Sequence, residues 1–338
     1  MNFSTVAFAC ILVLALLALL RVWTNRRAPR AVRVVLSEFA LGKLTGQIEE
    51  VKRNVENAPA YKIRTNRGDY FVRPAARDED SQFLADVAAC LSDRGVLQPQ
   101  FRRTKSGGVK SRNDCTVCEM LPPCFVPANC PAARTCTIFE IAEHLANYNR
   151  QLAAFPTARH PAWLGTLNNA WDKADSLDWL LSEMLPVLED ATSCQTAFGT
   201  LHVSEETRSV ALDALKLLSA HRSELVAIPK QLTHGDLNPT NILCCSCEAK
   251  SSCSHNAPAR LCVIDFTAYS TESHVYSLLV FLFWQMIFRS RIANDDEASL
   301  HGQYFRAIVE RYHAAFALPE QSWHILDVLF VKVATRML

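Results

Sequence analysis

The sequence predicts a mixed α+β protein, and three patterns along the chain support this class. Residues 57–65 and 69–74 have the composition of two strands around Asn66-Arg67-Gly68-Asp69, a turn sequence typical of a hairpin. Residues 137–149 carry apolar side chains at helical spacing. Residues 234–266 have the pattern of a loop, a strand, a turn and a second strand. A chain of 338 residues, 49% apolar and 20% charged, is long enough to bury a sizeable core.

Three further elements complete this outline. Residues 81–91 are predicted to form a helix after the hairpin, and residues 115–122 a strand. Residues 278–288 form an apolar run that is too short to span a bilayer and contains Gln285. We therefore expect this run to be a buried helix in the interior of the protein.

The most informative stretch is 234–243 (His-Gly-Asp-Leu-Asn-Pro-Thr-Asn-Ile-Leu), followed by 263–266 (Val-Ile-Asp-Phe). Carboxylate and carboxamide oxygens are ligands of hard divalent cations, so Asn241 and Asp265 can meet at one cation while Asp236 faces an acceptor hydroxyl. A single Asp most often belongs to a turn or a helix cap. Here several polar residues interrupt runs that otherwise favour burial, so the combined pattern is far more specific. It indicates phosphoryl transfer from ATP.

This pattern resembles the signature H-G-D-x-x-x-x-N followed by I-D-[FW] of the aminoglycoside phosphotransferase, choline kinase and type II homoserine kinase superfamily. The resemblance implies a protein-kinase-like fold of two lobes, a small, mostly β N-lobe and a larger helical C-lobe. It implies Asp236 as the catalytic base, Asn241 and Asp265 as Mg²⁺ ligands, and ATP as the donor. His234 would brace the catalytic loop. Gly235 stands where protein kinases usually carry Arg, and no A-P-E follows, which disfavours a phospho-activated protein kinase.

The resemblance also extends upstream, to residues that would bind the nucleotide phosphates. Arg73, at the end of the second hairpin strand, takes the place of the Lys or Arg that binds the ATP phosphates in the family. A guanidinium group can bind phosphate oxygens in a bidentate manner. Asp86, in the helix that follows, is the candidate acid to hold this cation. The alternatives are an exposed cation at the strand end and an Asp on the helix surface.

The remaining nucleotide contacts are expected from a turn and a hinge. Asn57, together with Glu56, could form the glycine-poor turn that covers the nucleotide in some family members. The strand 115–122 would lead into the hinge between the lobes, where backbone groups of Glu119 and Leu121 would face adenine. The resemblance thus divides the chain into a leading segment 1–33, an N-lobe 34–121 that ends at the hinge, and a C-lobe 122–338 with the catalytic and metal-binding loops.

Two positions depart from the family pattern. Residues 137–149 resemble the family's L-A-x-x-H helix, with Asn149 in place of the usual His. After I-D-F the family usually shows Tyr-Asp-Leu, whose Asp braces the catalytic loop, and here Ser277 replaces that Asp. The bracing is therefore lost or supplied elsewhere, with Glu272 as a candidate substitute.

The N-terminus predicts a membrane anchor. Residues 5–20 contain no charge, and the run extends to residue 23 if Arg21 reaches the interface. This is near the lower limit of about 17–20 residues for spanning a bilayer. The basic residues follow the apolar run instead of preceding it, unlike a cleaved signal, and the positive-inside rule would place them in the cytosol. We expect an anchor through residues 5–23 with a cytosolic catalytic domain; the alternative is the secretory pathway.

The charge balance argues against nucleic acid as a partner. The chain has 35 Lys and Arg against 34 Asp and Glu. Five of the basic residues lie in one short acid-free segment: Arg21, Arg26, Arg27, Arg30 and Arg33. Because the rest of the chain is mildly acidic, we expect no nucleic-acid surface.

The chain has thirteen cysteines, and nine of them cluster in two groups. One group is Cys115, Cys118, Cys124, Cys130 and Cys136, and the other is Cys244, Cys245, Cys247 and Cys253 with His255 close behind. Thiolates at short spacing can form a tetrahedral zinc site. Cys115 and Cys118 are three apart in a predicted strand, so their side chains would point to opposite faces. The second group fills an apparent insertion between Asn241 and Asp265. This insertion could bind a metal, form disulfides under oxidising conditions or be a variable loop.

These expectations define a function and one alternative. The resemblance implies transfer of the ATP γ-phosphoryl group to a hydroxyl of a small molecule: an amino alcohol, an amino acid such as homoserine, a sugar or an aminoglycoside-like acceptor. The alternative is a membrane-tethered pseudokinase that binds nucleotide or a partner without catalysis. The glycine-poor turn and Ser277 favour this alternative, whereas the intact positions 236, 241 and 265 oppose it.

Overall fold

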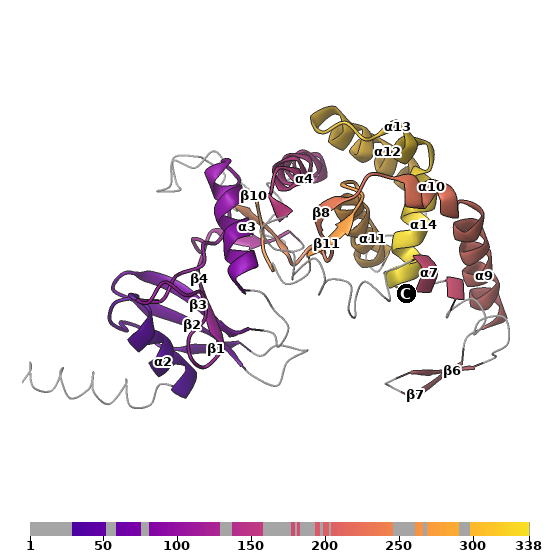
Figure 1. Cartoon of the computed structure of the whole chain (residues 1–338). Coiled ribbons are helices and arrows are strands. Elements are labelled where there is room, and N and C mark those ends of the chain that lie inside the picture. The colour runs from indigo at the N-terminus through magenta and orange to yellow at the C-terminus, as the bar shows by residue number, and fades with distance from the viewer. Residues whose placement is uncertain are drawn as a thin grey trace, which may run out of the picture. The chain divides into compact units, whose positions relative to one another are not determined.

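The computed structural model describes residues 29–51, 59–75, 81–128, 137–157, 177–179, 181–182, 193–196, 199–202, 204–245, 261–265, 269–290 and 298–337 (Figure 1). These residues form two compact units. The first unit comprises the described residues up to Ala88 together with Pro99–Leu121. The second comprises Ala89–Gln98 and the described residues from Pro122 onward.

The first unit is built on a four-stranded antiparallel sheet of order β1-β2-β3-β4. Its elements are α2 (Arg30–Glu38), β1 (Glu49–Val51), β2 (Ala60–Thr65), β3 (Gly68–Pro74), the first part of α3 (Ser81–Asp93) and β4 (Cys115–Glu119). Helix α2 covers one face of the sheet (Figure 1), where Val32 and Val35 share a core with Ile63, Tyr70 and Val72. Successive strand residues point to opposite faces, so Arg73 lies on the other face of β3.

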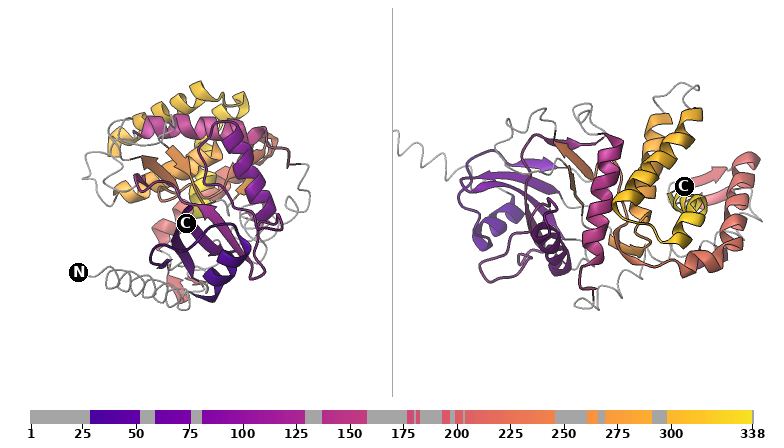
Figure 2. Two further views of the ribbon diagram at one scale, coloured as in Figure 1. Left: turned by 90° about the vertical axis from the view of Figure 1, so that its left-hand side faces the viewer. Right: turned by 90° about the horizontal axis from the view of Figure 1, so that it is seen from above.

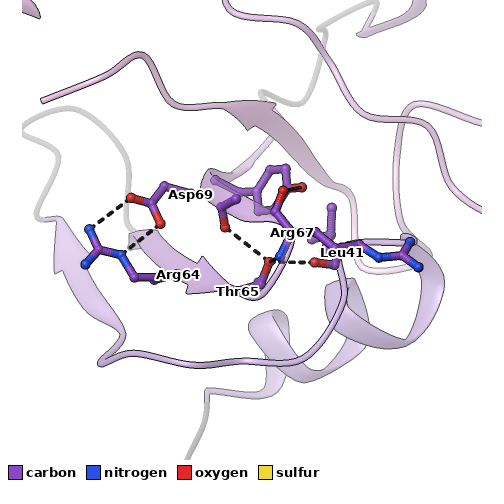
Figure 3. Close-up of polar contacts among 7 residues, drawn as sticks. Leu41, Arg64, Thr65, Arg67 and Asp69 are labelled. Carbon is purple, nitrogen blue, oxygen red and sulfur yellow. Dashed lines mark hydrogen bonds and ion pairs between the residues drawn. The ribbon is translucent and has the colours of Figure 1, made fainter. Parts of the chain in front are cut away.

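The predicted hairpin is confirmed as β2 and β3, joined through Asn66 and Arg67 (Figure 3). The Thr65 hydroxyl donates to the carbonyl of Leu41 at 2.6 Å and accepts from the Arg67 amide at 3.1 Å. Gly42 has a φ of +88°, and a Cβ there would lie 2.2 Å from Oδ1 of Asn66. Only glycine therefore allows the segment before the sheet to approach this turn so closely.

The second unit is mostly helical, with three small antiparallel sheets. Its strands are β5 (Phe125–Pro127), β6 (Ser193–Thr196), β7 (Gly199–His202), β8 (Gln231–His234), β9 (Ile242–Cys245), β10 (Leu261–Val263) and β11 (Tyr269–Glu272). Their orders are β10-β9-β5, β11-β8 and β6-β7. The helices are α4 (Ile138–Ala153), α7 (Leu177–Trp179), α9 (Glu205–Ala220), α10 (Arg222–Ala227), α11 (Tyr276–Ser290), α12 (Ala298–Ala315), α13 (Glu320–His324) and α14 (Leu326–Met337).

The core of the second unit forms around α4 and α11. Helix α11 confirms the predicted buried helix, because its side chains from Tyr276 to Phe283 are buried. It packs against α14 and α4, and α12 runs alongside α4 (Figure 2). Helix α4 begins with a capping box: Thr137 Oγ1 accepts from the Glu140 amide at 3.2 Å, and the Glu140 carboxylate accepts from the Thr137 amide at 2.7 Å. The predicted helices at 81–91 and 137–149 are thus confirmed as α3 and α4.

The expectation of a membrane anchor is corrected. Within the ranges that the structure describes, no helix is long and apolar enough to cross a bilayer. Even the apolar helix α11 has only 15 residues, about 22 Å at 1.5 Å per residue, against a hydrocarbon core of about 30 Å. The predicted segment 5–23 lies outside the described residues. The membrane partner and the membrane-anchored localisation are therefore not retained.

Candidate active site

Backbone and side-chain hydrogen bonds bring the three signature residues of the second unit onto adjoining segments. The loop from Gly235 to Asn241 joins β8 to β9, and Asp265 follows β10. Nδ2 of Asn241 donates to the carbonyl of Asp236 at 2.8 Å and lies 3.5 Å from its carboxylate oxygen Oδ2. The amide of Ile264 donates to the carbonyl of Asn241 at 2.8 Å. Ile264, the residue before Asp265, is thus hydrogen-bonded to Asn241, whose side chain holds the loop of Asp236.

His234 is the centre of this arrangement. Its Nε2 lies 3.0 Å from the carbonyl of Ile264, and its Nδ1 accepts from the Asp236 amide at 3.3 Å. Because a carbonyl can only accept, Nε2 carries the proton, and because an amide only donates, Nδ1 does not. The ring is therefore a neutral imidazole that connects the Asp236 loop to the Asp265 segment.

Electrostatics agree with this assignment. Burial lowers the pKa of His234, outweighing the charges of Asp265 and Asp236, which raise it. Both carboxylates therefore act on the same ring. A protonated ring would also present Nδ1–H to the Asp236 amide, so the neutral form is the one that holds the loop.

Ser277 supplies a bond that the sequence did not predict. Its side chain is fully buried at the start of α11, and its hydroxyl donates to the carbonyl of His234 at 3.0 Å. Glu272, the expected substitute, instead pairs with Lys332 of α14 at 2.9 Å. The spacing after I-D-F showed that a carboxylate was missing. It did not show that a buried hydroxyl at the same position still bonds to the residue before the candidate catalytic loop.

Two structural features suit Asn241 and Asp265 to the binding of a hard cation. The Asn241 amide nitrogen is engaged with Asp236, which leaves the carboxamide oxygen as the atom that can bind a metal. Asp265 has a φ of 64°, a left-handed conformation that side chains rarely adopt and that is often found at functional sites. A carboxylate and a carboxamide oxygen are donors of the type that Mg²⁺ or Ca²⁺ prefers.

Asn238 is a second residue that the sequence reasoning missed. Its Nδ2 lies 3.3 Å from both carboxylate oxygens of Asp236, and its Oδ1 accepts from the Thr240 amide at 2.9 Å. The side chain therefore shapes the loop and orients the Asp236 carboxylate at once. An Asn followed by Pro-Thr is a turn signal that could have identified it.

Asn149, which replaces the family histidine, is buried in a polar network of the second unit. Its Nδ2 donates to the carbonyl of His274 at 2.8 Å and to the Tyr312 hydroxyl at 3.0 Å. The backbone carbonyl of Asn149 accepts from Nε2 of Gln231, in β8, at 2.8 Å. This network connects α4 and α12 to the strand that leads into the candidate catalytic loop.

The candidate phosphate-binding residues lie in the first unit. Arg73 is only 7% exposed, so the alternative of an exposed strand-end cation does not hold. It stands opposite Thr116 of β4, and its guanidinium donates to the carbonyl of Pro74 at 3.4 Å. Asp86 of α3 accepts from Gln82 at 2.6 Å and has Arg103 as a cationic partner at 3.4 Å.

Of the predicted hinge residues, Glu119 is the last residue of β4 and Leu121 lies two residues further along the chain. The turn with Asn57 lies outside the described residues. The amide of Glu119 donates to the carbonyl of Gln100 at 2.9 Å, and its carboxylate pairs with Arg102 at 2.6 Å. The amide of Met120 donates to the carbonyl of Asp69 at 3.0 Å. Two amides at the end of β4 are therefore occupied within the sheet, and Leu121 comes directly after them.

Solved structures show which class of protein has this fold. The amicoumacin kinase hAmiN, in complex with AMP-PNP, Ca²⁺ and Ami, matches with a TM-score of 0.58 at 14% identity, over 93% of this chain and 86% of that chain. A microcompartment-associated aminopropanol kinase matches with a TM-score of 0.56 at 14% identity, over 87% and 83%. An aminoglycoside phosphotransferase from Alicyclobacillus acidocaldarius matches with a TM-score of 0.53 at 15% identity, over 89% and 82%. The predicted kinase-like fold, with a small β unit and a helical unit, is thereby confirmed.

Sequence comparison carries the assignment further. No curated protein sequence matches the chain. The family model described as the phosphotransferase enzyme family matches residues 47–310, and the chain belongs to this family. The predicted superfamily and the predicted enzyme class, a small-molecule kinase, are thereby confirmed.

Proposed function

We propose that this enzyme transfers the γ-phosphoryl group of ATP to a hydroxyl group of a small molecule, with Mg²⁺ as the metal. The observation that carries the proposal is the bonding of Asp236, Asn241 and Ile264–Asp265 around one neutral histidine. Membership of the phosphotransferase family supports the same reaction.

The signature residues of the second unit and the residues bonded to them each have one proposed role. Asp236, oriented by Asn238, accepts the proton of the acceptor hydroxyl as its oxygen attacks. The oxygen of Asn241 and the carboxylate of Asp265 would hold Mg²⁺, which would offset the negative charge that develops during transfer. His234 and Ser277 keep the loop in place, so that positioning contributes to the rate.

Residues of the first unit are assigned to the nucleotide. Arg73 binds phosphate oxygens through its guanidinium group, and Asp86 is assigned to hold this phosphate-binding cation. Asn57 covers the nucleotide. Because the amides of Glu119 and Met120 are occupied within the sheet, the carbonyl of Glu119 and the amide of Leu121 are assigned to adenine. The domain limits 34–121 and 122–338 are proposed for the two lobes.

The acceptor is proposed at the level of a chemical class. The named acceptors of the amicoumacin, aminopropanol and aminoglycoside kinases define the first panel of compounds. Choline, homoserine and simple sugars extend it. Transfer of labelled γ-phosphate from ATP in the presence of Mg²⁺ identifies the accepted compound.

The roles are tested by substitution of the two acids. Asp236→Asn keeps the shape of the side chain but removes the base, and we expect turnover to fall by about 10²–10⁴-fold. Asp265→Ala should also lower turnover by orders of magnitude. Asp213→Asn, at an exposed aspartate of α9 whose side chain is 75% exposed, is the matched control and should retain activity. Wild-type turnover in folded Asp236→Asn and Asp265→Ala proteins would refute these roles, and a wild-type chain that binds ATP without transfer would identify a pseudokinase.

A further inference from the structure

Thr116, in strand β4, has a buried hydroxyl group that the fold of the first unit does not use. The side chain is fully buried, and its Oγ1 atom has no hydrogen-bond partner among the residues that the structure describes. Most buried polar atoms of folded proteins are hydrogen-bonded, because burial removes the water that would otherwise bond to them. A buried hydroxyl without a bond costs stability, and such a cost indicates a role other than folding.

A second buried threonine of the same sheet provides a contrast. Thr65, the last residue of β2, is 6% exposed. Its hydroxyl donates to the carbonyl of Leu41 at 2.6 Å and accepts from the amide of Arg67 at 3.1 Å (Figure 3). These bonds hold the turn between β2 and β3. Thr65 is therefore a structural threonine, and Thr116 does not share its bonding.

The register of the sheet places Arg73 beside Thr116. The two residues lie directly opposite each other where β3 and β4 pair antiparallel. Side chains of such a pair lie on the same face of the sheet, with Cβ atoms about 4.5–5.5 Å apart. Because Arg73 is itself only 7% exposed, a buried cation and a buried hydroxyl are neighbours on this face.

The guanidinium group of Arg73 has the geometry to use this hydroxyl. A guanidinium carries five N–H donors in a planar arrangement, and a bidentate phosphate contact uses two of them. The protein can therefore bind the same group through the other donors. Nη1 of Arg73 donates to the carbonyl of Pro74 at 3.4 Å, which is longer than the usual N–H···O distance of about 2.7–3.2 Å. This long bond is weak, so the guanidinium can leave it at little cost.

We propose that Thr116 is a positioning residue for the nucleotide phosphates. When the guanidinium of Arg73 turns from the Pro74 carbonyl to a phosphate group, the hydroxyl of Thr116 accepts one of its remaining N–H groups and fixes its plane. The inference rests on the proposed assignment of Arg73 to the phosphates. It adds a residue that lies outside the signature motif and contributes through Arg73.

The position of Thr116 along β4 has a consequence for the whole nucleotide site. Thr116 lies three residues before Glu119, the last residue of the strand. At about 3.3 Å per residue, this spacing is about 10 Å. Glu119 is assigned to adenine and Arg73 to the phosphates. The same strand would therefore set the distance between the two ends of the nucleotide.

The first test compares stability in the absence of nucleotide. Thr116→Val replaces the hydroxyl with a methyl group of similar size. Because this change breaks no bond to a described residue, the urea midpoint should equal or exceed that of the wild type. Thr65→Val is the matched control, and its midpoint should fall because both bonds of the turn are lost. An equal fall in Thr116→Val would show that its hydroxyl supports the fold and would overturn the inference.

The second test measures binding by isothermal titration calorimetry, with a non-hydrolysable ATP analogue plus Mg²⁺ and, separately, with adenosine. Thr116→Val should raise the Kd of the analogue about tenfold, the effect of one hydrogen bond to a charged group. The Kd of adenosine should not change, because adenosine has no phosphate. Thr116→Ser keeps the hydroxyl and should bind both ligands like the wild type. In steady-state kinetics the KM for ATP should rise more than kcat falls.

A double variant tests whether Thr116 contributes through Arg73. Arg73→Met alone should weaken binding of the analogue, because the phosphates lose their cation. In the Arg73→Met background, Thr116→Val should cause no further loss, since the hydroxyl then has no guanidinium to bind. Additive losses would show that the two residues act independently.

Three binding results would overturn the inference and leave the assignment of Arg73 intact. They are an unchanged Kd of the analogue in Thr116→Val, an equal loss for the analogue and adenosine, and a further loss in the Arg73→Met background. A fourth result concerns the proposed function itself. If folded Arg73→Met binds the analogue like the wild type, Arg73 does not bind the phosphates, and the inference about Thr116 is wrong with it.

Discussion

The candidate catalytic loop and the β2–β3 hairpin are held by hydrogen bonds of nearly equal length in very different surroundings. In the hairpin, Arg64 donates to both carboxylate oxygens of Asp69 at 2.9 and 3.0 Å, with side chains 68% and 38% exposed (Figure 3). In the catalytic loop, the 3.0 Å bonds of His234 and Ser277 involve side chains that are fully buried. Water competes for the first set and cannot reach the second.

This difference indicates which contacts contribute most to the stability of the protein. An exposed ion pair exchanges protein contacts for water contacts at little net gain. Removing one partner of a buried polar pair leaves the other without a hydrogen bond, and that costs far more. Glu272 and Lys332, whose side chains are 12% and 11% exposed, form an ion pair that is also largely buried. Substitutions should therefore rank by burial and not by bond length.

The largest effect is expected at the Glu272–Lys332 pair. Lys332→Met should destabilise the protein by about 3–5 kcal/mol, because the Glu272 carboxylate would remain buried without its cation. The double variant Glu272→Leu/Lys332→Met should recover most of that loss. Urea denaturation of the wild type, both single variants and the double variant measures this. Equal losses in the single and double variants would show that burial does not govern this pair.

The second prediction concerns pH. The Nε2 atom of His144 is buried, with no hydrogen-bond partner among the described residues, and burial lowers the pKa of this imidazole to about 4. In the unfolded chain the pKa of this imidazole is about 6.5. Below that pH the unfolded chain binds a proton there, whereas the buried imidazole of the folded protein stays neutral. Stability should therefore fall by about 1.4 kcal/mol per pH unit between pH 6.5 and 4.

His144→Leu sharpens this pH prediction. The variant removes the titrating group, so its free energy of unfolding should change less steeply across the same window, as measured by urea denaturation at several pH values. His221→Leu, at a partly exposed histidine beside Glu224, is the control and should leave the slope in place. A slope unchanged by His144→Leu would assign the pH dependence to other groups.

The third prediction tests the Ser277 hydroxyl. Ser277→Ala leaves the carbonyl of His234 without its donor, at a cost of about 1–3 kcal/mol. Because the bond holds the loop of Asp236, kcat should fall more than KM rises. Ser277→Thr keeps the hydroxyl and should recover part of kcat. Steady-state kinetics with the identified acceptor measure this split, and an unchanged kcat in Ser277→Ala would remove Ser277 from the loop support.

The smallest effect is expected in the hairpin. Arg64→Ala removes both bonds to Asp69, yet we expect the urea midpoint to stay within experimental error, because solvent replaces both contacts. Any residual difference should vanish in high salt, which screens exposed charges. A large loss of stability that does not depend on salt would contradict the expected difference between the exposed and the buried contacts.

What the sequence predicted well was encoded locally. The hairpin of β2 and β3, helix α4 and the buried helix α11 each followed from turn residues or periodicity within one short segment. The signature loop was recognisable because Asp236 and Asn241 stand five residues apart in a fixed pattern. Local chemistry therefore predicted the elements and the candidate catalytic residues.

What the sequence did not predict depends on contacts between distant residues. Arg103 pairs with Asp86 from 17 residues away, and Cys245 meets Cys124 across 121 residues. Ser277 donates to His234 across 43 residues. The sequence showed that the family Asp is missing at this position, but it did not show that the serine hydroxyl donates a hydrogen bond there. The membrane expectation was wrong for a different reason, because it rested only on an apolar run and on charge asymmetry in the sequence.

The orientation of Asn241 has a further consequence for the proposed metal site. Its NH₂ group is held by the Asp236 carbonyl, and an aspartate at this position would direct a negative oxygen at that carbonyl. An amide supplies a neutral oxygen instead, so that Asp265 is the one negatively charged group of the two proposed ligands. The doubly charged ion would then keep a net positive charge with which to offset the negative charges of the nucleotide phosphates.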